Sequence, residues 1–263
     1  ITSSKQAKRF YGFLSLGAAG GTYIAGLFYK YQGFSLITKL GIICAVMIIM
    51  FVSYNLMATD IRKNPEVYQI EPKVKKSKKK LSMLDSFKFL IKSKYLGLLA
   101  MIVLGYNSFI SLFESTWKGS LAEVANSLAA QGGSKEAFLT DIYGMQSQFS
   151  GLVQFFFVLF VSSWVSGKSW KFAALFTPVL CLLGTTIYAS FVNFSDVFAS
   201  FFQNTEYSPM QIGVFVGLFV LVLVKAAKYV FFDTTKERAY IPLDEDSKIT
   251  GKPAIDSVGS RLG

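Results

Sequence analysis

The sequence predicts an all-α, polytopic membrane protein, and three observations support that fold class. Hydrophobic residues make up 52% of the 263 residues and charged residues only 16%, a balance too apolar for an ordinary soluble domain. Apolar stretches of about 20 residues, the length that crosses a bilayer, recur along the chain. Lys and Arg are concentrated between particular stretches, as in membrane proteins of defined orientation.

Six stretches are long and apolar enough to be predicted as membrane spans. The first is rich in Gly and Ala at spacings that let helices pack closely. Because the number is even, both ends of the chain are expected on one side of the membrane. The predicted spans are residues 10–29, 37–58, 95–116, 143–165, 171–193 and 209–231.

Positive charge predicts which side each loop faces. Residues 59–94 contain the run KVKKSKKK and many further lysines, so the positive-inside rule makes this loop cytoplasmic. The N-terminus, the turn around Lys168 and the tail after Phe232 are assigned to the same side. The loops near Tyr31, at 119–141 and at 195–208 are poor in Lys and Arg and are expected outside.

The basic segment at 59–94 also contains a short amphipathic pattern. Apolar residues recur at helical spacing between Leu81 and Ile91, with lysines on the other side. This pattern predicts an interfacial helix that binds membrane lipids. The simpler alternative is a solvated basic linker with some affinity for phospholipid headgroups, and neither interpretation gives the segment a substrate role.

Catalytic and metal-binding chemistry is not indicated by the sequence. The chain has no His, and its two cysteines, Cys44 and Cys181, lie far apart in apolar stretches. The letters GKS at 167–169 resemble the end of a phosphate-binding loop, but Ser162 stands where the first glycine is required. We therefore expect no enzyme activity and no cofactor. The net charge of +11 follows from membrane sidedness, so no nucleic-acid partner is expected.

Among the charged residues in or beside the predicted spans, four are the most informative: Glu114, Lys118, Lys225 and Lys228. An ionisable group at membrane depth is costly, so it usually faces a water-filled cavity or a partner charge. Simpler interpretations remain open. Glu114 and Lys118 are one helical turn apart and can pair at an exposed helix end, and Lys228 can extend to the inner interface.

Uncharged polar residues form faces on two of the predicted spans. Such hydrogen-bonding faces suit a hydrated central cavity better than a bundle surrounded only by lipid. The third span carries Asn107, Ser108 and Ser111, and the fourth carries Gln146, Gln148, Ser150 and Gln154.

Three stretches resemble one known family. The segment KAAKYVFFDTTKERAYIPLDEDSKITGKPAIDSVGSRLG at 225–263 closely resembles the hallmark region of the ATP/ADP translocases of plastids and obligate intracellular bacteria, typified by KYxLFDPTKEMAYIPLD and KGKAAIDVVGARLGK. FESTWKGSL at 113–121 is similar to the family's VEVTWKSQL, and KRFYGFLSLGA at 8–18 to an earlier span. Thr234 and Arg238 depart from the usual Pro and Met.

The resemblance implies a major-facilitator-like architecture of twelve spans in two halves, of which this chain supplies the fifth to the tenth. Residues 1–58 would end the N-terminal half, 59–94 would be the cytoplasmic linker, 95–231 would begin the C-terminal half, and 232–263 would be a charged cytoplasmic loop. The chain is then expected to be an internal fragment whose partner is the remainder of the same transporter. The expected location is the inner membrane of an intracellular bacterium or of a plastid envelope.

The function implied is nucleotide transport, most simply ATP/ADP exchange by alternating access. Fixed lysines would replace the lost hydration of the phosphates. Proton-coupled or net import of other nucleotides or NAD, and a non-transporting membrane scaffold, stay open as alternatives. The expected substrate-binding residues are Glu114, Lys118, Lys225 and Lys228, and the expected gate is Asp233, Lys236, Glu237, Arg238, Asp244 and Asp246.

Overall fold

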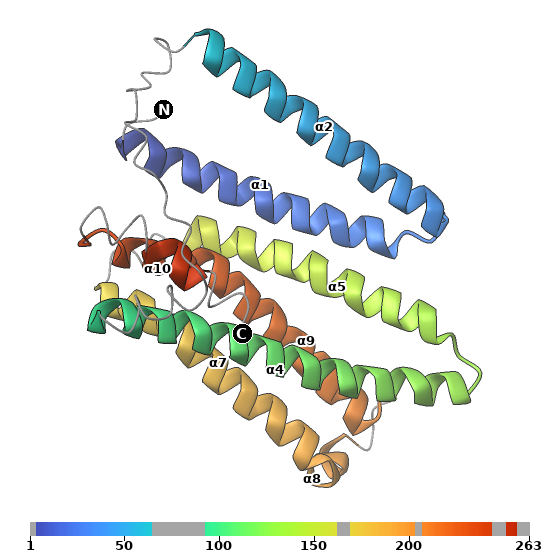
Figure 1. Cartoon of the computed structure of the whole chain (residues 1–263). Coiled ribbons are helices and arrows are strands. Elements are labelled where there is room, and N and C mark those ends of the chain that lie inside the picture. The colour runs from blue at the N-terminus through green and yellow to red at the C-terminus, as the bar shows by residue number, and fades with distance from the viewer. Residues whose placement is uncertain (1–3, 65–92, 162–168, 203–206, 244–250, 257–263) are drawn as a thin grey trace.

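The computed structural model of the chain describes residues 4–64, 93–161, 169–202, 207–243 and 251–256 (Figure 1). Within these ranges the chain forms helices and turns without a strand, which confirms the predicted all-α class. The interfacial helix predicted between Leu81 and Ile91, and the gate residues Asp244 and Asp246, lie outside the described residues. The main helices are α1 (Ser4–Lys30), α2 (Leu36–Lys63), α4 (Lys94–Ala130), α5 (Lys135–Phe156), α7 (Trp170–Asn193), α8 (Ser195–Phe201), α9 (Pro209–Ala227) and α10 (Asp233–Ala239).

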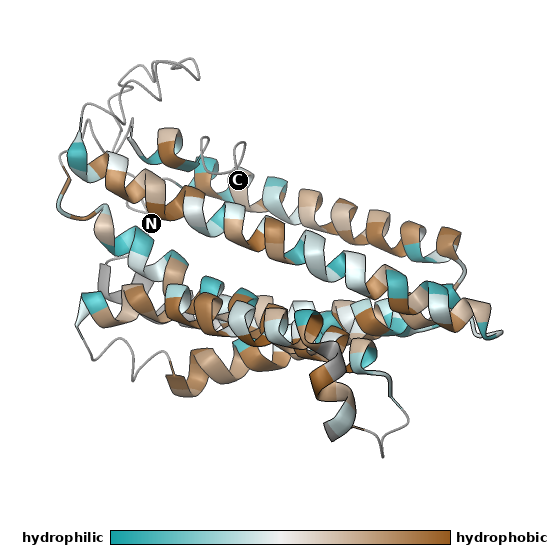
Figure 2. Cartoon of the chain, turned by 90° about the horizontal axis from the view of Figure 1, so that it is seen from below, coloured by the Kyte–Doolittle hydropathy of each residue, from teal (hydrophilic) through white to brown (hydrophobic). Residues whose placement is uncertain are grey.

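Five helical runs are long and apolar enough to cross a membrane, namely Leu36–Lys63, Lys94–Ala130, Lys135–Val161, Trp170–Asn193 and Pro209–Ala239, and hydrophobic residues dominate these long helices (Figure 2). They correspond to five of the six predicted spans. The first predicted span falls within α1, whose 27 residues are sufficient in length. Because of its composition, α1 is not among these five runs. The span predicted at residues 10–29 therefore stays a prediction.

Each of the five runs begins directly after a serine that caps the helix. The serine side-chain oxygen accepts a hydrogen bond from the backbone N–H three residues later, which satisfies one of the free donors of the first turn. At Ser208 a second bond completes a capping box, because the Gln211 side chain accepts a hydrogen bond from the Ser208 backbone N–H. The capping serines are Ser35, Ser93, Ser134, Ser169 and Ser208.

Two helical runs continue beyond the predicted span ends, and the difference changes where the charged residues lie along their helices. α4 continues from the predicted end at 116 to Ala130, because Leu121, Val124 and Ala125 keep the helical period and are buried. The outer loop predicted at 119–141 is therefore only the turn at 131–134. Likewise, a π-helix, η2 (Lys228–Phe232), joins α9 directly to α10. Glu114 and Lys225 consequently lie well inside their helical runs rather than near the ends.

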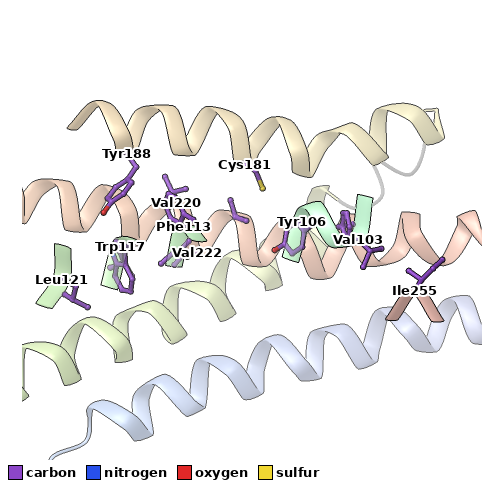
Figure 3. Packing of buried hydrophobic residues seen from close by; sticks show 14 of the residues in the cluster. Val103, Tyr106, Phe113, Trp117, Leu121, Cys181, Tyr188, Val220, Val222 and Ile255 are labelled. Atoms are coloured by element: carbon purple, nitrogen blue, oxygen red, sulfur yellow. The ribbon is translucent and has the colours of Figure 1, made fainter. Parts of the chain in front are cut away.

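α9 is the central helix of the bundle. It packs against α4, α5 and α7, and the main core lies along these contacts, where Trp117 and Leu121 are fully buried (Figure 3). Leu221 of α9 is also fully buried in this core. α1 lies along α5 on the other side (Figure 1). The α1–α5 approach is close because glycines face it: a Cβ at Gly151 would stand 2.7 Å from the Ala19 carbonyl oxygen.

α2 differs from the other long helices because it has no buried residue. It lies beyond α1, apart from α4, α7 and α9 (Figure 1). Its first half nevertheless reaches one wall of a large cavity, described next.

Candidate functional site

A cavity of about 1040 Å³ lies among α1, α2, α4, α5 and α9. Its volume is in the upper range for small-molecule sites. Four aromatic rings, those of Phe28, Tyr29, Tyr143 and Tyr229, contribute to its wall. Its polar and charged lining consists of Thr22, Lys39, Glu114, Lys118, Gln146, Ser147, Ser150, Gln154 and Lys225.

The cavity uses one of the two predicted polar faces. Gln146, Ser150 and Gln154 of α5 line it, whereas Gln148 of the same helix does not. The predicted face on α4, Asn107, Ser108 and Ser111, does not line this cavity, and its contact with a hydrated path stays a prediction. From α4, the cavity lining includes Glu114 and Lys118.

Glu114 binds two lysines at the cavity wall. Its Oε1 lies 3.0 Å from Nζ of Lys118, four residues along α4, and its Oε2 lies 3.2 Å from Nζ of Lys225 on α9. The predicted Glu114–Lys118 pair is therefore confirmed, but it is not an isolated pair at a helix end. One carboxylate shared by two ammonium groups leaves one net positive charge, and an anion entering the cavity can compete with the carboxylate for both lysines.

Trp117 places this charged cluster. Its side chain is fully buried, and its indole Nε1 donates a hydrogen bond to the Val214 carbonyl oxygen of α9 at 2.9 Å. Gly217 leaves space for the indole, because any Cβ there would collide with the ring. The Trp117 contact thus fixes α4 against α9, with Glu114 and Lys118 on either side of Trp117 in the sequence.

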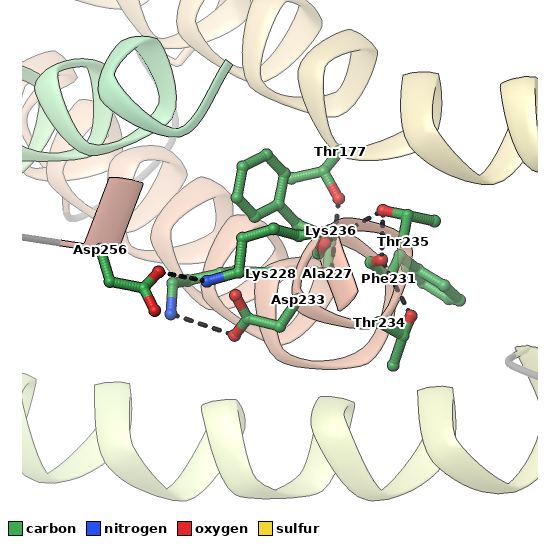
Figure 4. Close-up of polar contacts among 10 residues, drawn as sticks. Thr177, Ala227, Lys228, Phe231, Asp233, Thr234, Thr235, Lys236 and Asp256 are labelled. Carbon is green, nitrogen blue, oxygen red and sulfur yellow. Dashed lines mark hydrogen bonds and ion pairs between the residues drawn. The ribbon is translucent and has the colours of Figure 1, made fainter. Parts of the chain in front are cut away.

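Lys228 belongs to a different contact from Lys225. Its Nζ lies 3.2 Å from Oδ2 of Asp233 and 4.5 Å from the centre of the Tyr229 ring, and it does not line the cavity. Lys225 and Lys228 therefore have different surroundings, since η2 begins at Lys228 and Asp233 binds its ammonium (Figure 4); that both lysines bind substrate stays a prediction. Thr177 contributes to this region by donating to the Ala227 carbonyl oxygen at 3.3 Å.

The charged residues of α10 form pairs with a short helical segment at 251–256. Lys236 lies 3.2 Å from Asp256 (Figure 4), and Glu237 lies 2.7 Å from Lys252. Arg238 is exposed and forms no ion pair within the described part of the chain. Of the predicted gate, Asp233, Lys236 and Glu237 therefore lie in separate ion pairs, and Lys252 and Asp256 are partners that the sequence prediction missed.

Three other charged residues were missed. Lys39 of α2 lines the cavity, and its Nζ donates to the Tyr29 carbonyl oxygen at 2.9 Å. Lys30 of α1 and Asp141 of α5 form an ion pair of 2.8 Å that joins the two helices. All three lie within three residues of the ends of the predicted spans, where a charge is ordinary, so composition carried no signal for their contacts.

Comparison with known proteins gives consistent matches over the whole chain. A family model described as "TLC ATP/ADP transporter" matches residues 1–263. ADP,ATP carrier protein 1 of Rickettsia bellii is 30% identical over 277 residues, covering 100% of the chain and 54% of the relative. ADP,ATP carrier protein 1 of Chlamydia muridarum is 34% identical over 280 residues (100% and 51%), and a plastidic ATP/ADP-transporter of Solanum tuberosum is 33% identical over 275 residues (100% and 42%).

The chain therefore spans about half the length of the curated relatives it matches. No solved structure gives a significant match.

Proposed function

Because the chain belongs to the TLC ATP/ADP transporter family, we propose that it forms part of the translocation path of a membrane carrier that exchanges ATP for ADP. The observation that carries the proposal is the Glu114–Lys118–Lys225 cluster on the wall of the 1040 Å³ cavity. The location we propose is the inner membrane of an intracellular bacterium or of a plastid envelope. The partner we propose is the rest of the transporter.

The charge of the cluster suits a nucleotide phosphate. ATP and ADP carry several negative charges, and moving them into a membrane requires cations that replace their hydration. Lys118 and Lys225 are side by side on Glu114, so both can turn to a phosphate without a large movement of either helix. When the cavity is empty, Glu114 keeps the two ammonium groups from repelling each other.

Exchange also requires the cavity to open alternately to the two sides of the membrane. In the proposed mechanism the first two helices and the α4–α10 bundle move relative to one another along the glycine-lined contact of α1 and α5. Ion pairs near the ends of this bundle, such as Lys30–Asp141 and Lys236–Asp256, would break and re-form during that motion.

Uptake by intact cells tests the proposed exchange. Cells expressing the protein from its complete coding sequence are supplied with labelled ATP, ADP, GTP or NAD, with and without internal ADP. We expect ATP and ADP uptake that depends on internal ADP and that Lys225→Gln strongly reduces. Lys171→Gln is the matched control, because Lys171 is exposed on α7 and outside the cavity lining.

The other outcomes assign other functions. Uptake that does not depend on internal nucleotide would indicate net import. A preference for GTP or NAD would contradict the substrate. A protein that takes up none of the four, and whose melting temperature none of them changes, would be a scaffold rather than a carrier.

A further inference from the structure

Three polar side chains of α5 line the cavity without a hydrogen-bond partner in the part of the chain that the structure describes. Gln146, Ser150 and Gln154 follow one another at intervals of four residues, so they lie on one face of the helix. They are 9%, 9% and 6% exposed, and all three line the cavity. None of them forms a side-chain hydrogen bond within the described residues. We call these residues the α5 stripe.

The polar atoms of the α5 stripe are not shut off from solvent, since the fully buried unpaired polar atoms of the described side chains are the hydroxyls of Tyr106 and Tyr240. Amides and hydroxyls that are this little exposed usually have hydrogen-bond partners, because a lost partner costs the interactions made with water. The remaining exposure of the α5 stripe is toward the cavity, so its partners are molecules that enter there. A glutamine amide offers two N–H donors and one carbonyl acceptor without any charge.

The α5 stripe differs chemically from the charged part of the same cavity. Glu114, Lys118 and Lys225 come from α4 and α9 and satisfy one another by ion pairs. The α5 side offers uncharged hydrogen-bonding groups together with Tyr143, whose ring meets Trp117 edge-on with 6.2 Å between the ring centres. The cavity therefore has a wall for an anion and a second wall for a flat, polar, uncharged group.

From this arrangement we infer that the α5 stripe and Tyr143 form a subsite that reads the nucleobase, while the lysines bind the phosphates; this inference rests on the proposed function. The adenine edge combines an N–H donor with a ring-nitrogen acceptor, which is the pattern that one glutamine amide complements. Guanine places a carbonyl acceptor where adenine has its amino group. The α5 stripe is thus a specificity element, separate from the residues that bind charge.

Ligand-dependent melting of the purified protein tests the subsite, with ATP, GTP and inorganic tripolyphosphate as probes. Tripolyphosphate shares the charge of ATP but has no base. Gln146→Leu and Gln154→Leu should each raise the apparent Kd for ATP about tenfold, the ratio that follows from one lost hydrogen bond of about 1.4 kcal/mol. The Kd for tripolyphosphate should stay within about twofold, and the preference for ATP over GTP should shrink.

Gln148→Leu is the matched control, because it makes the same change on the same helix outside the cavity lining, and it should leave all three affinities unchanged. Equal losses of ATP and tripolyphosphate affinity in the α5 variants would overturn the inference in favour of a packing role. Unchanged ATP affinity would overturn it directly. A wild-type protein that binds ATP but fails in the uptake assay would contradict only the proposed exchange. The base subsite is tested separately, by the affinities of the α5 variants for ATP, GTP and tripolyphosphate.

Discussion

Lys225 of α9 and Glu114 of α4 form an ion pair, with 3.2 Å between Nζ and Oε2, at the wall of the cavity. The same carboxylate binds Lys118 through its other oxygen at 3.0 Å. Both ends of the Lys225–Glu114 pair lie inside helical runs that are long and apolar enough to cross a membrane. Charges held at such depth are expensive to bury singly, so the pair stabilises the positions of both groups.

Neutralising Glu114 should damage transport without unfolding the protein. Glu114→Gln keeps the size and hydrogen bonding of the side chain but leaves Lys118 and Lys225 close together without a counter-charge. Phosphate should then be released slowly, and ATP uptake should fall about tenfold or more while membrane abundance stays near normal. Glu123→Gln, at an exposed position of α4, is the control for uptake and abundance. Normal uptake by Glu114→Gln would assign the carboxylate a structural role only.

The two lysines of α9 and η2 should differ in effect. Lys225→Gln removes a cation from the cavity lining, and a charged hydrogen bond of about 1.5–3 kcal/mol corresponds to an increase in the KM for ATP of about 10- to 100-fold. The increase should be smaller for AMP, which has less phosphate charge. Lys228→Gln should change KM little, since Lys228 binds Asp233 instead. Equal effects of the two variants in uptake kinetics would refute this division.

A methyl group at Gly217 should disturb the anchor of the charged cluster. Its Cβ would collide with the indole of Trp117, and overpacking of this kind costs about 1–3 kcal/mol. We expect Gly217→Ala to lower the melting temperature of the detergent-solubilised protein. Gly105→Ala is the control, because no heavy atom lies within 4 Å of a Cβ at that position of α4. A Gly217→Ala protein that melts no lower than the control would show that the indole can move at no cost.

Gly151 should be equally sensitive at the contact between α1 and α5. A Cβ at this position would stand 2.6 Å from the Tyr23 backbone nitrogen, and a backbone atom can move away only if the whole helix moves. Gly151→Ala should therefore separate α1 from α5 and reduce both uptake and thermal stability. Gly20→Ala places its Cβ in open space and should have neither effect. Wild-type uptake by Gly151→Ala would mean that the close approach is not needed for transport.

The membrane orientation can be tested at described helix ends. In a background without Cys44 and Cys181, a cysteine at Asn64 should react with a membrane-impermeant thiol reagent only from the cytoplasmic side. A cysteine at Gln131 should react only from outside, because the turn at 131–134 joins two spans and lacks Lys and Arg. Labelling of position 64 in intact cells would reverse the assignment.

Local patterns in the sequence were sufficient for the class of the protein and for most of its spans. Length and hydropathy identify five helices that are suited to crossing a membrane. Each spanning segment must be long and apolar enough by itself, whichever helix it packs against. Glu114, Lys118 and Lys225 were recognisable because a charge in an apolar stretch is costly wherever its partner lies. The hallmark stretch indicated the family because it depends only on residue order.

Contacts between helices were decided only by the tertiary structure. Sequence spacing placed Lys118 one turn from Glu114, but it could not place Lys225 there, because that contact depends on how α4 and α9 are aligned through Trp117. Lys228 binds Asp233 and does not line the cavity, although simple helical spacing put it beside Lys225. Periodicity in the sequence shows which residues share a face of one helix. Which faces of two helices contact each other depends on how the side chains of both helices pack together.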